Sequence, residues 1–75
     1  MRIELRLYAS LARYMPSGDG NMEVVAGSSV RTVLEELRVP LKEVKMIFLN
    51  GLHAKGDELL NEGDRVGVFP PVAGG

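Results

Sequence analysis

The strongest structural signal in this chain is the stretch Ser28-Ser29-Val30-Arg31-Thr32-Val33-Leu34-Glu35-Glu36-Leu37-Arg38. Its apolar residues recur at i, i+3, i+4 and i+7, which is the spacing of one face of a helix. These residues are Val30, Val33, Leu34 and Leu37. Ser28 or Ser29 can cap the free N–H groups at the helix start. Because Pro40 disfavours helical backbone in the residue before it, we expect the helix to end at Arg38.

Strand patterns flank this helix on both sides. The expected strands cover residues 2–8, 22–26, 45–50, 52–55 and 65–69. The first alternates apolar and polar side chains, which predicts one buried and one wet face. In the second, Met22 and Val24 should share a face. The third and fourth are joined by Asn50-Gly51, a strong tight-turn signal. Residues 9–14 could add one helical turn, with Leu11 packing back onto the sheet.

This order of elements predicts an α+β fold, with a small mixed sheet and one main helix packed across one face. A chain of 75 residues supports one domain, and its length lies near the lower limit for folding without disulfides or a bound metal. We therefore expect a domain over residues 1–69 and an extended tail over residues 70–75.

Composition excludes several classes of function. The net charge of -1 without any basic run argues against nucleic-acid binding. The chain has no cysteine, so disulfides, thiolate metal sites and a cysteine nucleophile are excluded. No apolar stretch predicts a signal peptide or a membrane span, so we expect a cytoplasmic protein without membrane contact.

The titratable side chains do not form a recognisable catalytic or metal site. His53 is the only histidine, and we interpret it as a surface residue. Asp57, Glu58, Glu62 and Asp64 lack the spacing of a calcium loop, so we interpret them as solvated turn charges. The chain has no glycine-rich phosphate loop, and we expect no metal and no cofactor bound by the chain itself.

The end of the chain is unusual. Its last residues are Phe69-Pro70-Pro71-Val72-Ala73-Gly74-Gly75. The prolines stiffen the exit from the last strand, and the glycines provide a thin tip that could enter a narrow channel in another protein. Phe69 should face away from Val66 and Val68, where it could anchor a partner. Phe48 belongs to a strand that is apolar on both faces, and it is the second expected partner-binding residue.

Several motifs together resemble the ubiquitin-like sulfur carrier family (MoaD/ThiS), most closely the small subunit of molybdopterin synthase. The motifs are Tyr8-Ala9-x-Leu11-Ala12, Ser29-Val30-x-x-Val33-Leu34, Leu49-Asn50-Gly51, Gly63-Asp64, the apolar strand 65–69, Pro70-Pro71 and Gly74-Gly75. The resemblance covers nearly the whole chain and implies the β-grasp fold. Two departures are the short segment 39–45 and Gly67, where the family commonly has a larger residue.

The resemblance implies chemistry at the C-terminal carboxylate of Gly75. In the family, an adenylating activating enzyme uses ATP and Mg to form an acyl-adenylate at this carboxylate, and sulfur from a donor such as a cysteine desulfurase converts it to a thiocarboxylate. The large subunit of molybdopterin synthase, or an equivalent acceptor enzyme, receives the sulfur. Gly74, Ala73, Val72, Pro71 and Pro70 would thread the tail into these partners. The chain would be a sulfur-carrying co-substrate and not an autonomous enzyme.

Three alternatives remain open from the sequence. The sulfur could go to another pathway, namely the thiazole of thiamine, an amino acid or tRNA. The chain could instead be a ubiquitin-like modifier that is conjugated to proteins through Gly75. A plain interaction module is the third alternative, and it alone would tolerate loss of Gly74 and Gly75.

Overall fold

The computed structural model describes residues 1–16 and 18–71. Its elements are β1 (Arg2–Leu7), a 3₁₀ helix (Ala9–Tyr14), β2 (Asn21–Glu23), α1 (Val30–Glu36), a second 3₁₀ helix (Leu41–Glu43), β3 (Met46–Leu49), β4 (Leu52–Ala54) and β5 (Arg65–Phe69). The expected order of elements is confirmed, and β5 has the predicted bounds. The short helix before β3 was not predicted.

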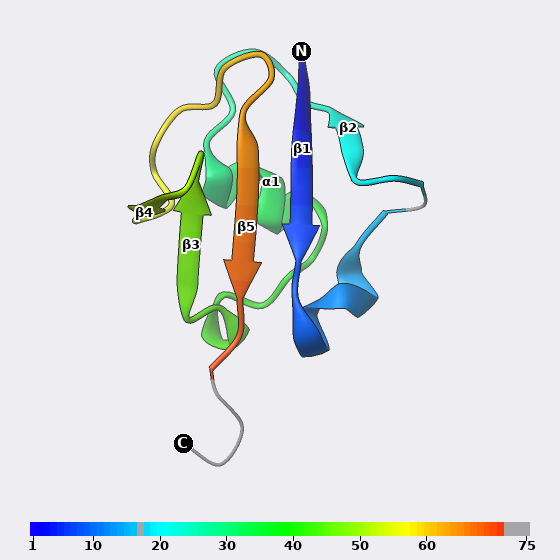
Figure 1. Cartoon of the computed structure of the whole chain (residues 1–75), viewed down its shortest axis with the longest axis vertical. Helices are drawn as coiled ribbons and strands as arrows, with labels where there is room; N and C mark the ends of the chain where they lie inside the picture. Colours follow the sequence, from blue (N-terminus) through cyan, green and yellow to red (C-terminus); the bar gives the residue numbers. More distant parts are fainter. Residues whose placement is uncertain (17, 72–75) are drawn as a thin grey trace.

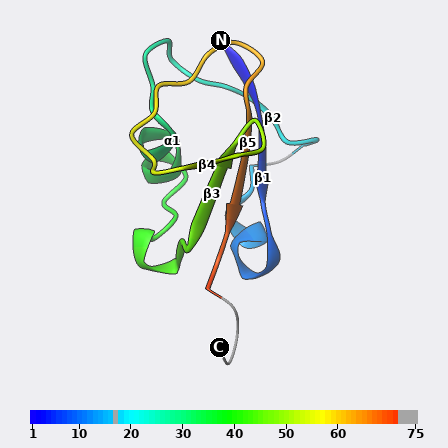
Figure 2. The ribbon, with the colours of Figure 1, turned by 60° about the vertical axis from the view of Figure 1, so that its left-hand side comes forward.

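The strands form one mixed sheet in the order β2-β1-β5-β3-β4 (Figure 1). The central pair, β1 and β5, is parallel, whereas the other three pairs are antiparallel. Helix α1 lies across one face of this sheet, as the turned view shows (Figure 2). The predicted α+β class is therefore confirmed.

The core lies between α1 and the covered face of the sheet. Its fully buried side chains include Ile3, Leu5, Leu11, Val30, Val33, Leu34 and Val68. Because side chains alternate along a strand, the other residues of the first strand region point to the opposite face. Tyr8, which follows β1, is 42% exposed there. The periodicity of the sequence thus predicted correctly which faces of β1 and α1 are buried.

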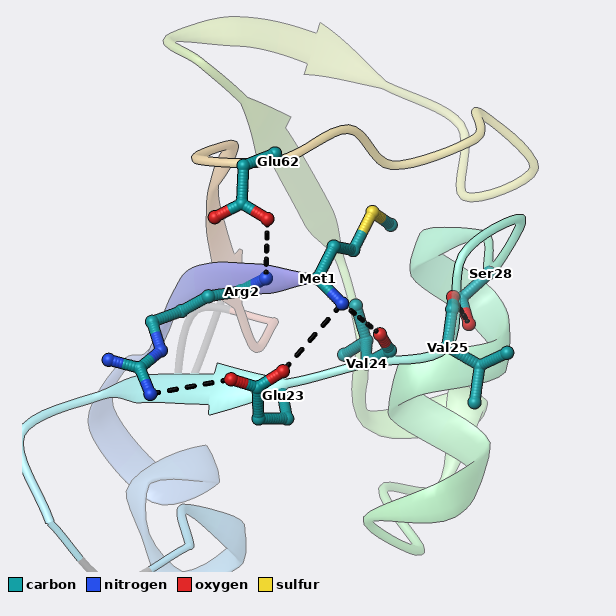
Figure 3. Close-up of polar contacts among 7 residues, drawn as sticks. All are labelled: Met1, Arg2, Glu23, Val24, Val25, Ser28 and Glu62. Carbon is teal, nitrogen blue, oxygen red and sulfur yellow. Dashed lines mark hydrogen bonds and ion pairs between the residues drawn. The ribbon is translucent and has the colours of Figure 1, made fainter.

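Strand β2 is shorter than expected, and its predicted extension to Ala26 is wrong. Its last paired residue, Glu23, lies opposite Arg2, next to the start of β1. The Met1 amino nitrogen donates to the Val24 carbonyl at 2.9 Å and lies 3.6 Å from a Glu23 carboxylate oxygen (Figure 3). Val24 and Met22 both pack toward the core. The Val24 N–H also donates to the Met1 carbonyl at 2.8 Å, so backbone bonding continues one residue beyond β2 before the chain turns at residues 26–27.

Helix α1 begins as predicted but ends early. The Ser29 hydroxyl accepts a hydrogen bond from the Thr32 N–H at 3.1 Å, so Ser29 is the cap. The helix ends at Glu36 rather than Arg38. Arg38 has a left-handed backbone with φ of 62°, and the Val39 N–H donates to the Leu34 carbonyl at 2.9 Å across it. This reversal satisfies a terminal carbonyl and turns the chain before Pro40 is reached.

Asp64 is not a solvated turn charge, so that interpretation is wrong. Its side chain is 9% exposed and accepts hydrogen bonds from the Asn50 amide nitrogen at 3.0 Å and the Asn61 N–H at 2.8 Å. The Asn50 amide oxygen in turn accepts from the Arg65 N–H at 2.9 Å. These bonds attach the tight turn between β3 and β4 to the start of β5.

Glu58 is also engaged, and its contacts predict a dependence of stability on pH. Hydrogen bonds from the N–H groups of Lys55 and Gly56 lower the pKa of Glu58 below its ordinary value of 4.5. A carboxylate whose pKa is lower in the folded state stabilises the fold above its ordinary pKa, and that contribution is lost as the pH falls through this range. We expect a carbon NMR titration to place the Glu58 midpoint below 4.5.

The same carboxylate can be tested by substitution. Glu58→Gln should reduce the loss of unfolding free energy on acidification, because the variant has no carboxylate to protonate at this position. Glu36→Gln is the matched control, since it removes an exposed carboxylate from α1. Equal acid sensitivity of wild type and Glu58→Gln would contradict this assignment.

Candidate functional site

The face of the sheet opposite α1 carries a shallow groove of about 550 Å³. It crosses β1, β5 and β3, and its lining includes Arg6, Tyr8, Phe48, Arg65, Gly67 and Phe69. The floor of the groove is formed by the residues of β1 that point away from the core, together with alternate residues of β5 and β3. Glu4 also lines the groove and pairs with Arg6 at 3.5 Å, so the groove combines charged groups of both signs with aromatic rings on a surface that α1 does not cover.

Three rings at one end of this groove form an aromatic cluster, defined here as Tyr8, Phe48 and Phe69. The rings of Tyr8 and Phe69 are stacked, with centroids 4.3 Å apart and planes 5° from parallel. Phe48 meets Phe69 edge-on at 5.7 Å and 89°. Stacked and edge-to-face pairs are favourable arrangements of aromatic side chains, so the cluster presents an ordered apolar surface.

The pairing of β5 with β1 on one side and with β3 on the other brings this cluster together. The Tyr8 N–H donates to the Val68 carbonyl at 3.0 Å, and the Lys45 N–H donates to the Phe69 carbonyl at 2.8 Å. Both bonds hold the end of β5. Phe69 faces away from the buried Val66 and Val68, as the sequence predicted, although the neighbouring rings leave it only half-buried and not fully exposed.

Gly67 lies beneath the cluster. A Cβ atom at this position would lie 3.5 Å from a ring carbon of Tyr8 and 3.9 Å from a ring carbon of Phe69, which are ordinary contacts. Alanine would therefore fit, whereas any longer side chain would extend into the groove. The departure noted at Gly67 thus keeps the groove open next to the stacked rings.

The predicted tail begins immediately after the cluster. Strand β5 ends at Phe69, Pro70 is half-buried and Pro71 is exposed. Val72, Ala73, Gly74 and Gly75 were predicted to form the threading and reactive part of the tail, and they lie outside the described residues. The structure therefore places the two predicted partner-binding residues, Phe48 and Phe69, in contact at the base of the tail.

Sequence reasoning missed Tyr8 as a member of this surface. The alternation along β1 placed it on the wet face, which is where it lies. Its contact with Phe69 depends on the pairing of two strands about 60 residues apart in the chain, in which Leu7 lies opposite Val68. Local periodicity gives the face of a side chain but not its neighbour on the next strand.

His53 is exposed, as predicted, and its ring meets the ring of Phe48 edge-on at 5.8 Å. It therefore borders the aromatic cluster. Within residues 1–16 and 18–71, no three His, Cys, Asp or Glu side chains gather as they would around a metal ion. None of the helices in this part of the chain is long and apolar enough to cross a membrane.

A five-stranded mixed sheet in the order β2-β1-β5-β3-β4 with one helix across it defines the β-grasp, or ubiquitin-like, class. The model of the ThiS family matches residues 5–75 of the chain. Since that match covers almost the entire sequence, the chain belongs to the ThiS family, whose members are small ubiquitin-like sulfur carriers and modifiers rather than enzymes. A search of curated proteins finds no significant match.

Solved structures of similar proteins agree with this fold. A Pyrococcus furiosus protein assigned as subunit 1 of molybdopterin converting factor is 27% identical, with 95% of this chain and 98% of that chain covered and a TM-score of 0.72. Small archaeal modifier protein 1 of H. volcanii is 26% identical, with the same coverage and a TM-score of 0.73.

A third structure contains a partner. It is the complex of subunits 1 and 2 of molybdopterin-converting factor from Helicobacter pylori, at 27% identity with full coverage of both chains and a TM-score of 0.60. In that protein the similar chain is bound to a second subunit.

Proposed function

We propose that this protein carries sulfur as a thiocarboxylate on Gly75 and serves as the small subunit of a molybdopterin-synthase-like complex. The observation that carries the proposal is the family match, which extends through Gly75. The two similar molybdopterin-converting subunits support this acceptor. The proposed division of the chain is a domain over residues 1–69 and a functional tail over residues 70–75.

The proposed chemistry begins with an unreactive group. A carboxylate is ionised at neutral pH, so it must be activated before sulfur can replace oxygen. The Gly75 carboxylate attacks the α-phosphate of ATP on an activating enzyme, and pyrophosphate leaves with Mg. Hydrosulfide then attacks the acyl carbon, and AMP leaves with one carboxylate oxygen. A persulfide donor, such as that of a cysteine desulfurase, gives the same product once a thiol reduces the acyl disulfide.

This chain contributes binding and positioning to that reaction. The aromatic cluster provides an ordered apolar surface at the base of the tail, where a partner can dock. Pro70 and Pro71 restrict the backbone that follows, which lowers the entropy cost of ordering the tail on binding. The glycines present little bulk to the channel in which the carboxylate reacts.

The test of this function is the intact mass of the protein before and after incubation with its activating enzyme, ATP and a sulfur donor. We expect a mass gain equal to replacement of one oxygen by one sulfur. The thiocarboxylate form should then transfer its sulfur to a molybdopterin precursor bound to the large subunit. If the same activating enzyme is shown to be active and the protein still gains no mass, the proposal is contradicted.

The docking role of the cluster can be tested separately. Phe69→Ala is expected to weaken binding to the activating enzyme or the large subunit roughly thirtyfold, because truncation of a central interface aromatic commonly costs about 2 kcal/mol. Calorimetric titration measures the Kd. Leu59→Ala is the matched control, since Leu59 is 64% exposed but lies outside the groove. An unchanged Kd for folded Phe69→Ala would contradict this role.

A second candidate function keeps the fold and changes the product. The similarity to small archaeal modifier protein 1 favours conjugation of Gly75 to lysine side chains of target proteins. Cellular proteins found linked to this chain through an isopeptide bond would support the modifier function. A chain found with a free C-terminal thiocarboxylate would support the sulfur-carrier function. Transfer of sulfur to the thiazole of thiamine, an amino acid or tRNA would retain the carrier chemistry with another acceptor.

A further inference from the structure

We propose that a second groove, beside α1, binds a segment of a partner protein that combines acidic residues with an apolar anchor. The groove has a volume of about 360 Å³, and its lining residues come from α1, the 3₁₀ helix Leu41–Glu43, the β3–β4 hairpin and the segments next to them. It is called the helix-side groove below. This inference goes beyond sulfur transfer and does not rest on it.

The floor of the helix-side groove is apolar. Leu34, Ile47 and Ala54 line it and are themselves 0%, 8% and 6% exposed. Val44 is half-buried at its side, and Leu41 is 47% exposed at its rim. An apolar side chain seated on this floor would remove exposed hydrophobic surface from water, which favours binding.

The rim of the helix-side groove is cationic. Arg31, Lys45 and Lys55 line it, and no acidic residue does. The Arg31 N–H donates to the Gly56 carbonyl at 2.7 Å. A Cβ atom on Gly56 would lie 3.6 Å from a guanidinium nitrogen of Arg31, so the Arg31 side chain runs along the loop that borders the groove.

Glu43 and Glu58 form no ion pair with this rim, although backbone hydrogen bonds and then the charge of Lys55 lower the pKa of Glu58. Glu43 pairs with Arg13 at 3.3 Å and accepts a hydrogen bond from the Tyr14 hydroxyl. Glu58 accepts hydrogen bonds from the N–H groups that follow Ala54, at distances from 2.8 to 3.1 Å. Among the ion pairs of the described chain, none involves the three cationic side chains of the rim.

Charge complementarity identifies the occupant. A positive rim attracts carboxylates, and an apolar floor favours a hydrophobic anchor over a free inorganic anion. A protein segment in which glutamates or aspartates flank aliphatic residues satisfies both. A second copy of this chain is a poorer fit, because its own acidic and basic residues are interspersed.

The groove and the aromatic cluster can be occupied together. Side chains of β3 alternate, so Ile47 lines the helix-side groove while Phe48 belongs to the cluster on the other face. Lys45 connects the two regions, since its N–H donates to the Phe69 carbonyl at 2.8 Å. His53 also lines the helix-side groove and meets the Phe48 ring edge-on at 5.8 Å, so a segment bound there would lie close to the base of the tail and beside the aromatic cluster.

The test is an NMR titration of the labelled full chain with a synthetic peptide in which a valine–isoleucine run is flanked by glutamates. We expect saturable shifts at the amides of Leu34, Ile47 and Gly56, which weaken as salt is added. The double variant Arg31→Gln/Lys55→Gln should bind about fivefold more weakly, as expected for loss of two partly exposed ion pairs. Lys42→Gln, an exposed charge outside the groove, should bind normally.

Four outcomes would overturn the proposal. Equal binding of a peptide with glutamines in place of the glutamates would remove the charge argument. Equal shifts with sodium phosphate would indicate an adventitious anion only. Shifts confined to Tyr8, Phe48 and Phe69 would place the peptide on the other face, and shifts that follow protein concentration alone would indicate a second copy. Weaker binding by the double variant supports the proposal only if its melting temperature equals that of the wild type.

Discussion

Deletion of Gly75 is expected to abolish formation of the thiocarboxylate while the domain stays folded. Binding in an activating site must place the terminal carboxylate within bonding distance of a phosphate, and misplacement by even 1 Å can cost about a hundredfold in rate. Removal of one residue withdraws that carboxylate by roughly 3.3 Å. The intact mass after incubation with activating enzyme, ATP and sulfur donor should therefore show no gain.

Two measurements on the same variant separate chemistry from folding and docking. Because β5 ends at Phe69, the melting temperature should be close to that of the wild type. Because the aromatic cluster lies before the tail, affinity for the partner should largely persist. A variant without Gly75 that still acquires sulfur at normal yield would contradict the assignment of the chemistry to Gly75.

Leu34→Ala is expected to have the largest effect on stability. Leu34 has 0% exposure at the centre of the core, and truncation of a buried leucine commonly costs about 3–5 kcal/mol. At about 0.05–0.15 kcal/mol per residue, a chain of this size has a total stability of roughly 4–11 kcal/mol. The variant should therefore lose a large share of its unfolding free energy, as measured by urea denaturation.

Leu52→Ala provides the matched control, because it removes the same atoms from a side chain that is 74% exposed. Its unfolding free energy should change by less than about 0.5 kcal/mol. Similar losses in the two variants would show that α1 is not packed on the sheet as described. Since Leu34 also lines the helix-side groove, Leu34→Ala should weaken binding of any ligand in that groove as well.

Local pattern was sufficient for the elements and their faces. The stripe of Val30, Val33 and Leu34 predicted α1 and its buried side, and alternation along residues 2–8 predicted the wet position of Tyr8. Asn50-Gly51 predicted a tight turn, and its two residues have φ of 54° and 84°. These features depend on residues close in the chain, so spacing and backbone preference alone determine them.

Contacts between distant segments required the tertiary structure. Sequence placed Asp64 in solvent, whereas Asn50 and Asn61 hold it in a buried turn. Strand β2 ends at Glu23, and Val24 beyond it bonds back to Met1 through two backbone hydrogen bonds. Likewise, the stack of Tyr8 on Phe69 and the cationic rim beside α1 join segments whose separation along the chain hides them from any local pattern. Periodicity determines which way a side chain points, and only the pairing of strands and the packing of the helix determine what it meets.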